Sequence, residues 1–118
     1  MDGRIFQLRN RILNDLKHQW TIEEMADYVE LSAPHLQKLF KIQIGMPPIA
    51  YVRELRLENA RELLATTFRR VKQIGFEVGM PNDSHFTRDF KRRYGVTPAE
   101  YRKHYWEKLQ VEKLDGRK

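Results

Sequence analysis

Apolar residues recur at steps of three and four along the first part of the chain, which is the spacing of one face of a helix. Over residues 4–18 this stripe comprises Ile5, Leu8, Ile12 and Leu16. A second helix is predicted over residues 22–30, because Thr21 is a typical N-cap residue. A third is predicted over residues 33–43, with Ser32 as its N-cap. These last two helices lie so close in sequence that they must cross steeply.

The longest predicted helix lies in the middle of the chain, over residues 47–66. Gly45 fits the left-handed position that ends the preceding helix, and Pro48 fits the first turn of this one. Its apolar side comprises Val52, Leu55, Ala60, Leu63 and Leu64. At about 1.5 Å per residue, roughly 20 residues span about 30 Å. We interpret it as a linker helix.

The chain contains an internal repeat. Phe40, Lys41, Gly45, Pro48 and Tyr51 recur fifty positions later as Phe90, Lys91, Gly95, Pro98 and Tyr101. Further upstream the matching positions are forty-nine apart, as for Ile22 and Val71 or Val29 and Val78. The second copy therefore has one additional residue, near Pro81. One structural unit has been used twice.

The second copy predicts the same helices as the first. Val71, Ile74 and Val78 form the apolar side of a short helix, in which Gly75 lets a neighbouring helix approach closely. Asn82 is the expected N-cap of the helix that follows. A capping-box pattern over residues 97–100 then opens a last helix.

The predicted fold is all-α, with about seven helices. Two helix-turn-helix subdomains, over about residues 4–46 and 67–107, are joined by the linker helix over residues 47–66. Residues 108–118 are expected to form a tail that frays beyond about residue 112. Helix-turn-helix is the commonest arrangement for placing a helix in the major groove of DNA.

Composition points to a reducing compartment and a basic second half. The sequence has no cysteine, which excludes disulfides, thiolate metal sites and cysteine nucleophiles, and the cytoplasm is the expected location. Residues 1–66 carry nine Lys/Arg and nine Asp/Glu, whereas residues 67–118 carry thirteen and seven. Such a basic surface attracts polyanions, with nucleic acid the first candidate and an acidic membrane the second.

No catalytic or metal-binding pattern is recognisable in the sequence. The four histidines lack the paired spacing of a metal site and have no cysteine companions. A Ser/His/Asp arrangement and a glycine-rich phosphate loop are both missing. We therefore expect no enzyme activity and no cofactor.

Several segments carry a family resemblance. In the second copy these are IGFEVGM, SHFTRDFKR and GVTPAEYR, at residues 74–80, 84–92 and 95–102. With LQKLFK at residues 36–41 and the linker helix, they resemble the DNA-binding domain of the AraC/XylS family of bacterial transcription regulators. The resemblance covers about residues 5–105 and requires two ordered motifs, which makes it specific.

The resemblance implies how the chain would act. Two recognition helices would enter successive major grooves on one face of double-stranded DNA, so that a single, monomeric segment contacts an asymmetric site. A transcription regulator of this kind has RNA polymerase as a further expected partner. The sequence departs from the family at Gly75, usually alanine, and Met80, usually phenylalanine. Pro34 stands where members often place a base-contacting residue, so readout by the first motif would be narrower.

Base contacts are expected from the N-terminal half of each recognition helix. By helical counting, the outward positions are Pro34, Gln37 and Lys38 in the first copy and Ser84, Thr87 and Arg88 in the second. A guanidinium at Arg88 can bind guanine O6 and N7 together, whereas the Gln37 amide suits adenine N6 and N7. The alternative for each is an exposed polar side chain that contacts nothing.

Phosphate contacts are expected around these positions. The candidates are Ser32, Lys41, Lys91, Arg92, Pro98 and Arg102. Pro98 is included because it marks a helix start, where backbone N–H groups offer donors. For Arg92 and Arg102, a solvated helical face is an equally good interpretation.

A second class of function stays open at this point. The Phe/Tyr-rich helices could form a non-enzymatic module that binds protein, with a basic surface that only aids solubility. Steep salt dependence of DNA affinity, together with a measurable preference for one sequence, separates the two hypotheses.

Overall fold

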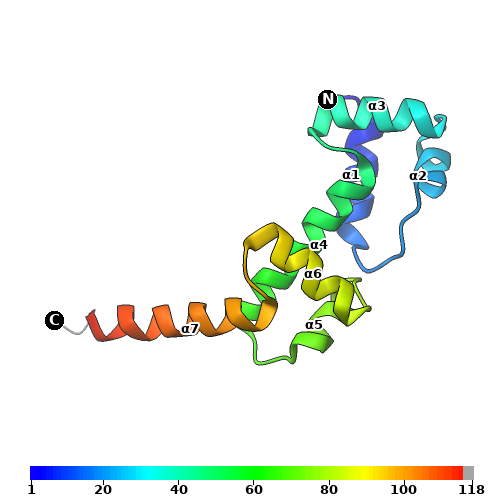
Figure 1. The fold of residues 1–118 in the computed structure, drawn as a ribbon. Helices are drawn as coiled ribbons and strands as arrows, with labels where there is room; N and C mark the ends of the chain where they lie inside the picture. The colour runs from blue at the N-terminus through cyan, green and yellow to red at the C-terminus, as the bar shows by residue number, and fades with distance from the viewer. Residues whose placement is uncertain (116–118) are drawn as a thin grey trace. The chain divides into compact units, whose positions relative to one another are not determined.

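The computed structural model describes residues 1–115, with side chains as far as residue 113. Its helices are α1 (Gly3–Asn14), α2 (Ile22–Val29), α3 (Ala33–Ile44), α4 (Pro48–Thr66), α5 (Val71–Glu77), α6 (Asp83–Tyr94) and α7 (Pro98–Asp115). Short loops and turns connect them, and no strand occurs among the described residues (Figure 1). The predicted all-α fold with seven helices is confirmed.

The chain divides into two compact units, each with its own core. Unit 1 comprises Met1–Arg56 and unit 2 begins at Leu57, so the boundary falls inside α4. One continuous helix therefore ends the first unit and begins the second.

The core of unit 1 is built by α1, α2, α3 and the first part of α4. Its buried side chains are Ile5, Leu8, Ile12, Met25, Ala26, Val29, Leu36, Phe40 and Val52. The predicted apolar side of the first helix is thus confirmed at Ile5, Leu8 and Ile12, while Leu16 follows the end of α1 and packs against the core partly buried.

The core of unit 2 repeats this arrangement with α4, α5, α6 and α7. Its buried side chains are Leu57, Ala60, Leu64, Ile74, Val78, Phe86 and Phe90. Gly75 makes room for Phe86, because a Cβ at this glycine would lie 2.9 Å from Phe86 Cδ2 and 3.0 Å from the Met80 carbonyl oxygen. The close approach predicted at Gly75 is therefore confirmed.

The recognition helices begin and end in the same way in both units. The Ser32 hydroxyl accepts the His35 backbone N–H at 3.3 Å, and the Asn82 side chain accepts that of His85 at 2.9 Å. Glycines end both helices in the left-handed conformation, with φ of 100° after α3 and 82° after α6. In both copies the N-caps fix the first turn, which is the part proposed to meet DNA, and the glycines fix the last turn.

Two helix ends differ from the sequence-based prediction. The first helix was expected over residues 4–18 but ends at Asn14, because Arg56 donates to the carbonyl oxygens of Leu16 and His18 and holds that segment as a turn. At the other end, α7 continues to Asp115 where a tail from residue 108 was expected. No proline or glycine interrupts α7 before Gly116, and its Glu, Lys, Leu and Gln residues favour helix.

Candidate nucleic-acid interface

The exposed face of α3 carries the polar positions that the sequence predicted. Pro34, Gln37, Lys38 and Lys41 are all exposed. The opposite face is anchored by Leu36 and Phe40, which are fully buried. Because the buried face fixes the rotation of the helix, the exposed side chains are presented to solvent from one rigid surface.

The exposed face of α6 repeats this pattern. Ser84, Arg88 and Lys91 are exposed and Thr87 is half-buried, while Phe86 and Phe90 are fully buried. The two phenyl rings pack edge to face with centroids 6.0 Å apart. Five of the six predicted base-contacting positions thus carry a polar side chain, the exception being Pro34, and the aromatic side of α6 is buried inside unit 2.

Arg88 lies at the centre of this face of α6. Its guanidinium is 57% exposed, and its Nε lies 3.4 Å from Oδ1 of Asp89. A long contact of this kind at the surface contributes little energy and is readily exchanged. Arg88 is therefore available to bind another hydrogen-bonding partner.

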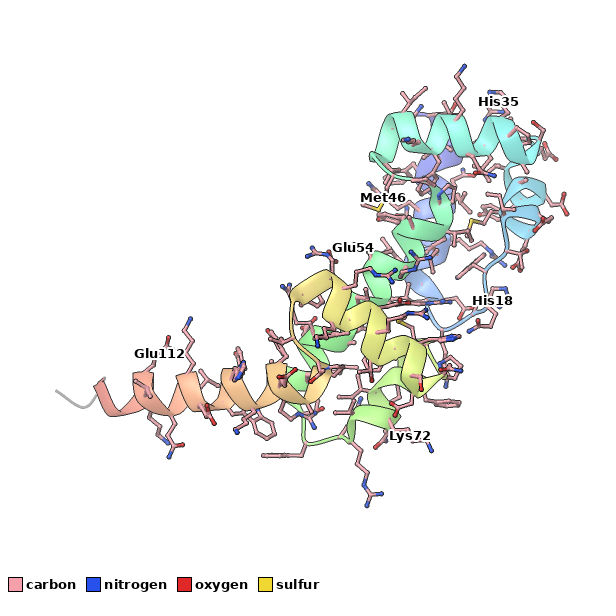
Figure 2. The ribbon with its side chains drawn as sticks, viewed as in Figure 1. His18, His35, Met46, Glu54, Lys72 and Glu112 are labelled. Carbon is pink, nitrogen blue, oxygen red and sulfur yellow. The ribbon has the colours of Figure 1, made fainter. Side chains whose placement is uncertain are left out.

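Two histidines occupy matching places that the sequence analysis did not include. His35 and His85 are exposed on the first turn of α3 and α6, one residue beyond Pro34 and Ser84. Figure 2 shows the His35 side chain projecting away from the body of unit 1. The fifty-residue repeat relates the two positions, and this was the signal that could have found them.

The predicted phosphate-contacting residues divide into two groups. Ser32, Lys41, Lys91 and Arg92 are exposed beside the two recognition helices, as a contact to the DNA backbone requires. Pro98 is buried, so only the backbone near it could contribute.

The helix start at Pro98 already has an internal partner. Thr97 and Glu100 form the predicted capping box: the Glu100 N–H donates to Thr97 Oγ1 at 3.2 Å, and the Thr97 N–H donates to Glu100 Oε1 at 2.9 Å. The hydrogen bond that the carboxyl accepts from the Thr97 N–H is the main cause that lowers the pKa of Glu100 below its ordinary value. A carboxylate thus occupies the position where a phosphate would have to approach, which weakens the case for Pro98.

Arg102 also has internal partners. Its Nε donates to the Leu64 carbonyl at 3.0 Å and its Nη2 donates to the Thr67 carbonyl at 3.2 Å. The guanidinium also lies over the Trp106 ring, 5.2 Å from its centroid. Burial lowers the pKa of Arg102 from its ordinary value. These contacts account for Arg102 as a side chain that holds α7 against the end of α4.

Other kinds of site are not formed by the described residues. Among them, no group of three or more His, Cys, Asp or Glu side chains is arranged to hold a metal ion. None of the helices described is both long enough and apolar enough to cross a membrane.

Comparison with known proteins identifies relatives of the whole arrangement. A family model described as a helix-turn-helix domain matches residues 25–104. The HTH-type transcriptional regulator MtrA of Neisseria gonorrhoeae is 33% identical over 102 residues, which are 86% of this chain and 34% of that protein. The chain thus spans about a third of the length of the curated relatives that it matches.

Solved structures with the same fold include a DNA complex. An AraC-type transcriptional regulator from Chromobacterium violaceum aligns with a TM-score of 0.78 and 29% identity, covering 86% of this chain and 91% of that one. The DNA-binding domain of AdpA, in complex with a target DNA, aligns with a TM-score of 0.87 and 22% identity, covering 91% and 96%. At 22% identity, the similarity to the AdpA domain shows that the two proteins share a fold.

Proposed function

The chain belongs to the AraC/XylS family of helix-turn-helix proteins, and we propose that it is the sequence-specific DNA-binding part of a bacterial transcription regulator. The observation that carries this proposal is the repeated recognition surface. Each unit presents one capped helix with a buried apolar side and an exposed polar side. The AdpA domain, which has this fold, was crystallised on its target DNA.

The base contacts follow from the exposed positions of α3 and α6. We assign them to Pro34, Gln37 and Lys38 in unit 1, and to Ser84, Thr87 and Arg88 in unit 2. Arg88 is suited to guanine and Gln37 to adenine, because each can form two hydrogen bonds with the major-groove edge of that base. Pro34 has no donor or acceptor in its side chain, so it can contribute only apolar contact, as to a thymine methyl group.

The phosphate contacts are assigned to the exposed residues around these faces. Ser32 and Lys41 serve unit 1, while Lys91 and Arg92 serve unit 2. Such contacts hold the register of the protein on the duplex and carry no sequence information themselves. We leave Pro98 and Arg102 out of this set, because their surroundings are already satisfied within unit 2.

In the proposed mode of action, one chain binds DNA through two recognition helices. Tandem units replace the symmetry of a dimer, so a monomeric segment would recognise an asymmetric site with two parts, one for each recognition helix. Its place of action would be the bacterial cytoplasm, and RNA polymerase would be the partner through which bound protein changes transcription.

Selection of bound sequences from a random DNA pool tests this proposal. The selected duplex and a scrambled duplex are then titrated at two salt concentrations. We expect the selected duplex to bind at least about a thousand-fold more tightly, with affinity falling steeply as salt rises. Weak binding that ignores both sequence and salt would contradict the proposal.

Weak binding that ignores sequence and salt would favour the alternative function, a helical module that binds protein. The observation on its side is Phe68, whose side chain is 90% exposed while its ring packs against Trp106 with centroids 5.2 Å apart. An exposed phenylalanine beside a half-buried tryptophan is typical of a contact with another protein.

A further inference from the structure

Unit 2 contains a hollow beside the start of its recognition helix. The hollow has a volume of about 460 Å³ and is lined by Arg70, Lys72, Gln73, Phe76 and Pro81. Four of these residues lie on α5 or just before it, and the fifth precedes Asn82, the N-cap of α6. Figure 2 labels Lys72 at this edge of α5. The hollow thus lies next to the end of α6 that carries the proposed base contacts.

The rim of the hollow is positively charged. Arg70 and Lys72 are exposed, and in the part of the chain that the structure describes neither forms an ion pair. The carboxylate of Glu77, at the end of α5, is already occupied: Arg69 Nη1 lies 2.8 Å from its Oε2, and Gln73 Nε2 donates to its Oε1 at 3.1 Å. Two cations at the rim therefore remain for an anionic ligand.

The repeat shows that packing does not require these charges. At a shift of forty-nine, the positions of Arg70, Lys72, Gln73 and Phe76 correspond to Thr21, Glu23, Glu24 and Asp27 on α2. The buried positions of α2 and α5 are apolar in both copies, whereas the exposed positions that correspond to Arg70 and Lys72 hold Thr21 and Glu23 in unit 1. The two rim cations therefore belong to unit 2 alone, and the shared packing does not account for them.

A DNA strand fits the chemistry of the hollow. Its backbone alternates anionic phosphates with apolar deoxyribose faces, and the hollow combines two cations with the ring of Phe76, which is 55% exposed. In helix-turn-helix proteins the first helix of the motif crosses the DNA backbone while the second enters the groove. Here α5 is that first helix, and the hollow is on its side nearest the start of α6.

We infer that unit 2 holds a stretch of DNA backbone in this hollow, with Arg70 and Lys72 on phosphates and Phe76 against a sugar, and that unit 1 makes no equivalent contact. The inference rests on the proposed function, and it means that the two units contact the DNA backbone differently. Unit 2 contacts the duplex through α5 as well as α6. In unit 1, the acidic side chains on α2 repel phosphates. The excess positive charge of residues 67–118 then has a specific use.

The test is the salt dependence of binding to the selected duplex. We compare the parent chain with the double variant Arg70→Gln, Lys72→Gln, and with a control variant, Lys108→Gln, Lys113→Gln, that removes two exposed charges from α7. Each phosphate contact contributes about 0.9 to the slope of log affinity against log salt. The α5 variant should therefore lose about 1.8 from this slope, while the control keeps the slope of the parent.

The preference for the selected over the scrambled duplex is measured in the same titrations. If the α5 variant keeps that preference and loses slope, the hollow binds the DNA backbone. If its slope equals that of the control, the inference is wrong and an acidic protein segment becomes the better occupant of the hollow. If the parent chain itself shows no preference for the selected duplex, the proposed function is wrong. Failure of the inference and failure of the proposed function are therefore distinguishable.

Discussion

Among the proposed base contacts of unit 2, Arg88 is the one that we expect to contribute most to base discrimination. It lies on the exposed face of α6, and its only described ion pair, with Asp89, is a long one of 3.4 Å that DNA can replace. Arg92, one turn further along, is exposed as well but lies beyond the reach of base edges in the proposed geometry. Removal of the two arginines should therefore have different effects on DNA binding.

Arg88→Ala should abolish the preference for one base pair, at a cost of about 1–3 kcal/mol in discrimination. Arg92→Ala should instead weaken binding to all sequences alike, because a phosphate contact carries no base information. Affinities for a panel of duplexes with single base changes measure both effects, and circular dichroism verifies that helicity is retained. Unchanged discrimination at every position in Arg88→Ala would show that this side chain does not read a base.

Glu30 shows a different consequence of the repeat. It ends α2 in the left-handed conformation, with φ of 58°, and the equivalent residue in unit 2 is Gly79, with φ of 90°. The following N–H bonds to the carbonyl five residues back in both units, from Leu31 to Ala26 and from Met80 to Gly75. The same turn is therefore made with a side chain in one copy and without one in the other.

Glu30→Gly should stabilise unit 1 by about 1 kcal/mol, since a left-handed residue with a Cβ is strained by about that amount. Glu23→Gly removes the same side chain from within α2 and should destabilise by up to about 1 kcal/mol, because glycine disfavours helix. Denaturant unfolding of the two variants gives the sign of each change. Destabilisation by both would mean that Glu30 makes contacts that outweigh its backbone strain.

In both units, side chains of the last helix donate to backbone carbonyls at or after the end of the first helix. In unit 1, Arg56 of α4 donates to the carbonyls of Leu16 and His18, just after α1. In unit 2, Arg102 and Trp106 of α7 donate to carbonyls at and just after the end of α4, the Trp106 Nε1 to that of Ala65 at 3.1 Å. In unit 2 the acceptors Leu64 and Ala65 belong to the last turn of α4, where carbonyls lack partners within the helix.

Arg102→Gln should accordingly lower the free energy of unfolding by about 1–3 kcal/mol, as expected for charged hydrogen bonds to partly buried carbonyls. Its exposed neighbour Lys103 provides the control, and Lys103→Gln should leave stability nearly unchanged. Denaturant unfolding measures stability, and the salt slope of DNA binding tests the earlier phosphate assignment. If Arg102→Gln is as stable as the parent and its salt slope falls by about 0.9, then Arg102 does contact a phosphate.

The start of α7 should make stability depend on pH. Hydrogen bonds from Thr97 lower the pKa of Glu100, so its stabilising effect is present above the ordinary carboxyl value of 4.5 and is lost as pH falls through the lowered value. The difference in unfolding free energy between the parent and Glu100→Ala should thus shrink between about pH 6 and about pH 3. Glu100→Gln, which keeps an acceptor but does not titrate, should remove this pH dependence. A difference that is constant with pH would mean that the capping box contributes through geometry alone.

The arrangement of helices could be predicted from the sequence because two independent signals agreed. Apolar periodicity located each helix, and the repeat showed that residues 22–51 and 71–101 must fold alike. Where prediction failed, the cause was tertiary: Arg56 ends α1 early from forty residues away, and no local pattern reveals that contact. The prediction of α7 was too short for a local reason: the charge of residues 108–113 indicated a tail, although their Lys and Glu residues also favour helix.

The exposed faces of α3 and α6 could be predicted in the same way, since the buried positions fix which residues face outward. The internal role of Arg102 could not, because an arginine on a helix has the same pattern whether it meets a phosphate or a carbonyl. The basic hollow beside α5 was also missed, although a comparison of Lys72 with Glu23 at the equivalent position would have pointed to it. Surface charge becomes informative only when the structure shows which surfaces correspond.

The central claim is that each of the two units reads its own part of one DNA site. Selection from a random pool with three proteins tests it: the parent, a unit 1 variant with Gln37→Ala and Lys38→Ala, and a unit 2 variant with Thr87→Ala and Arg88→Ala. The parent should enrich an asymmetric site with two conserved blocks about one helical turn, or about 10 base pairs, apart. Each variant should lose a different block and keep the other. Loss of the same block in both variants, or a single block in the parent, would contradict the claim that two units read DNA in tandem.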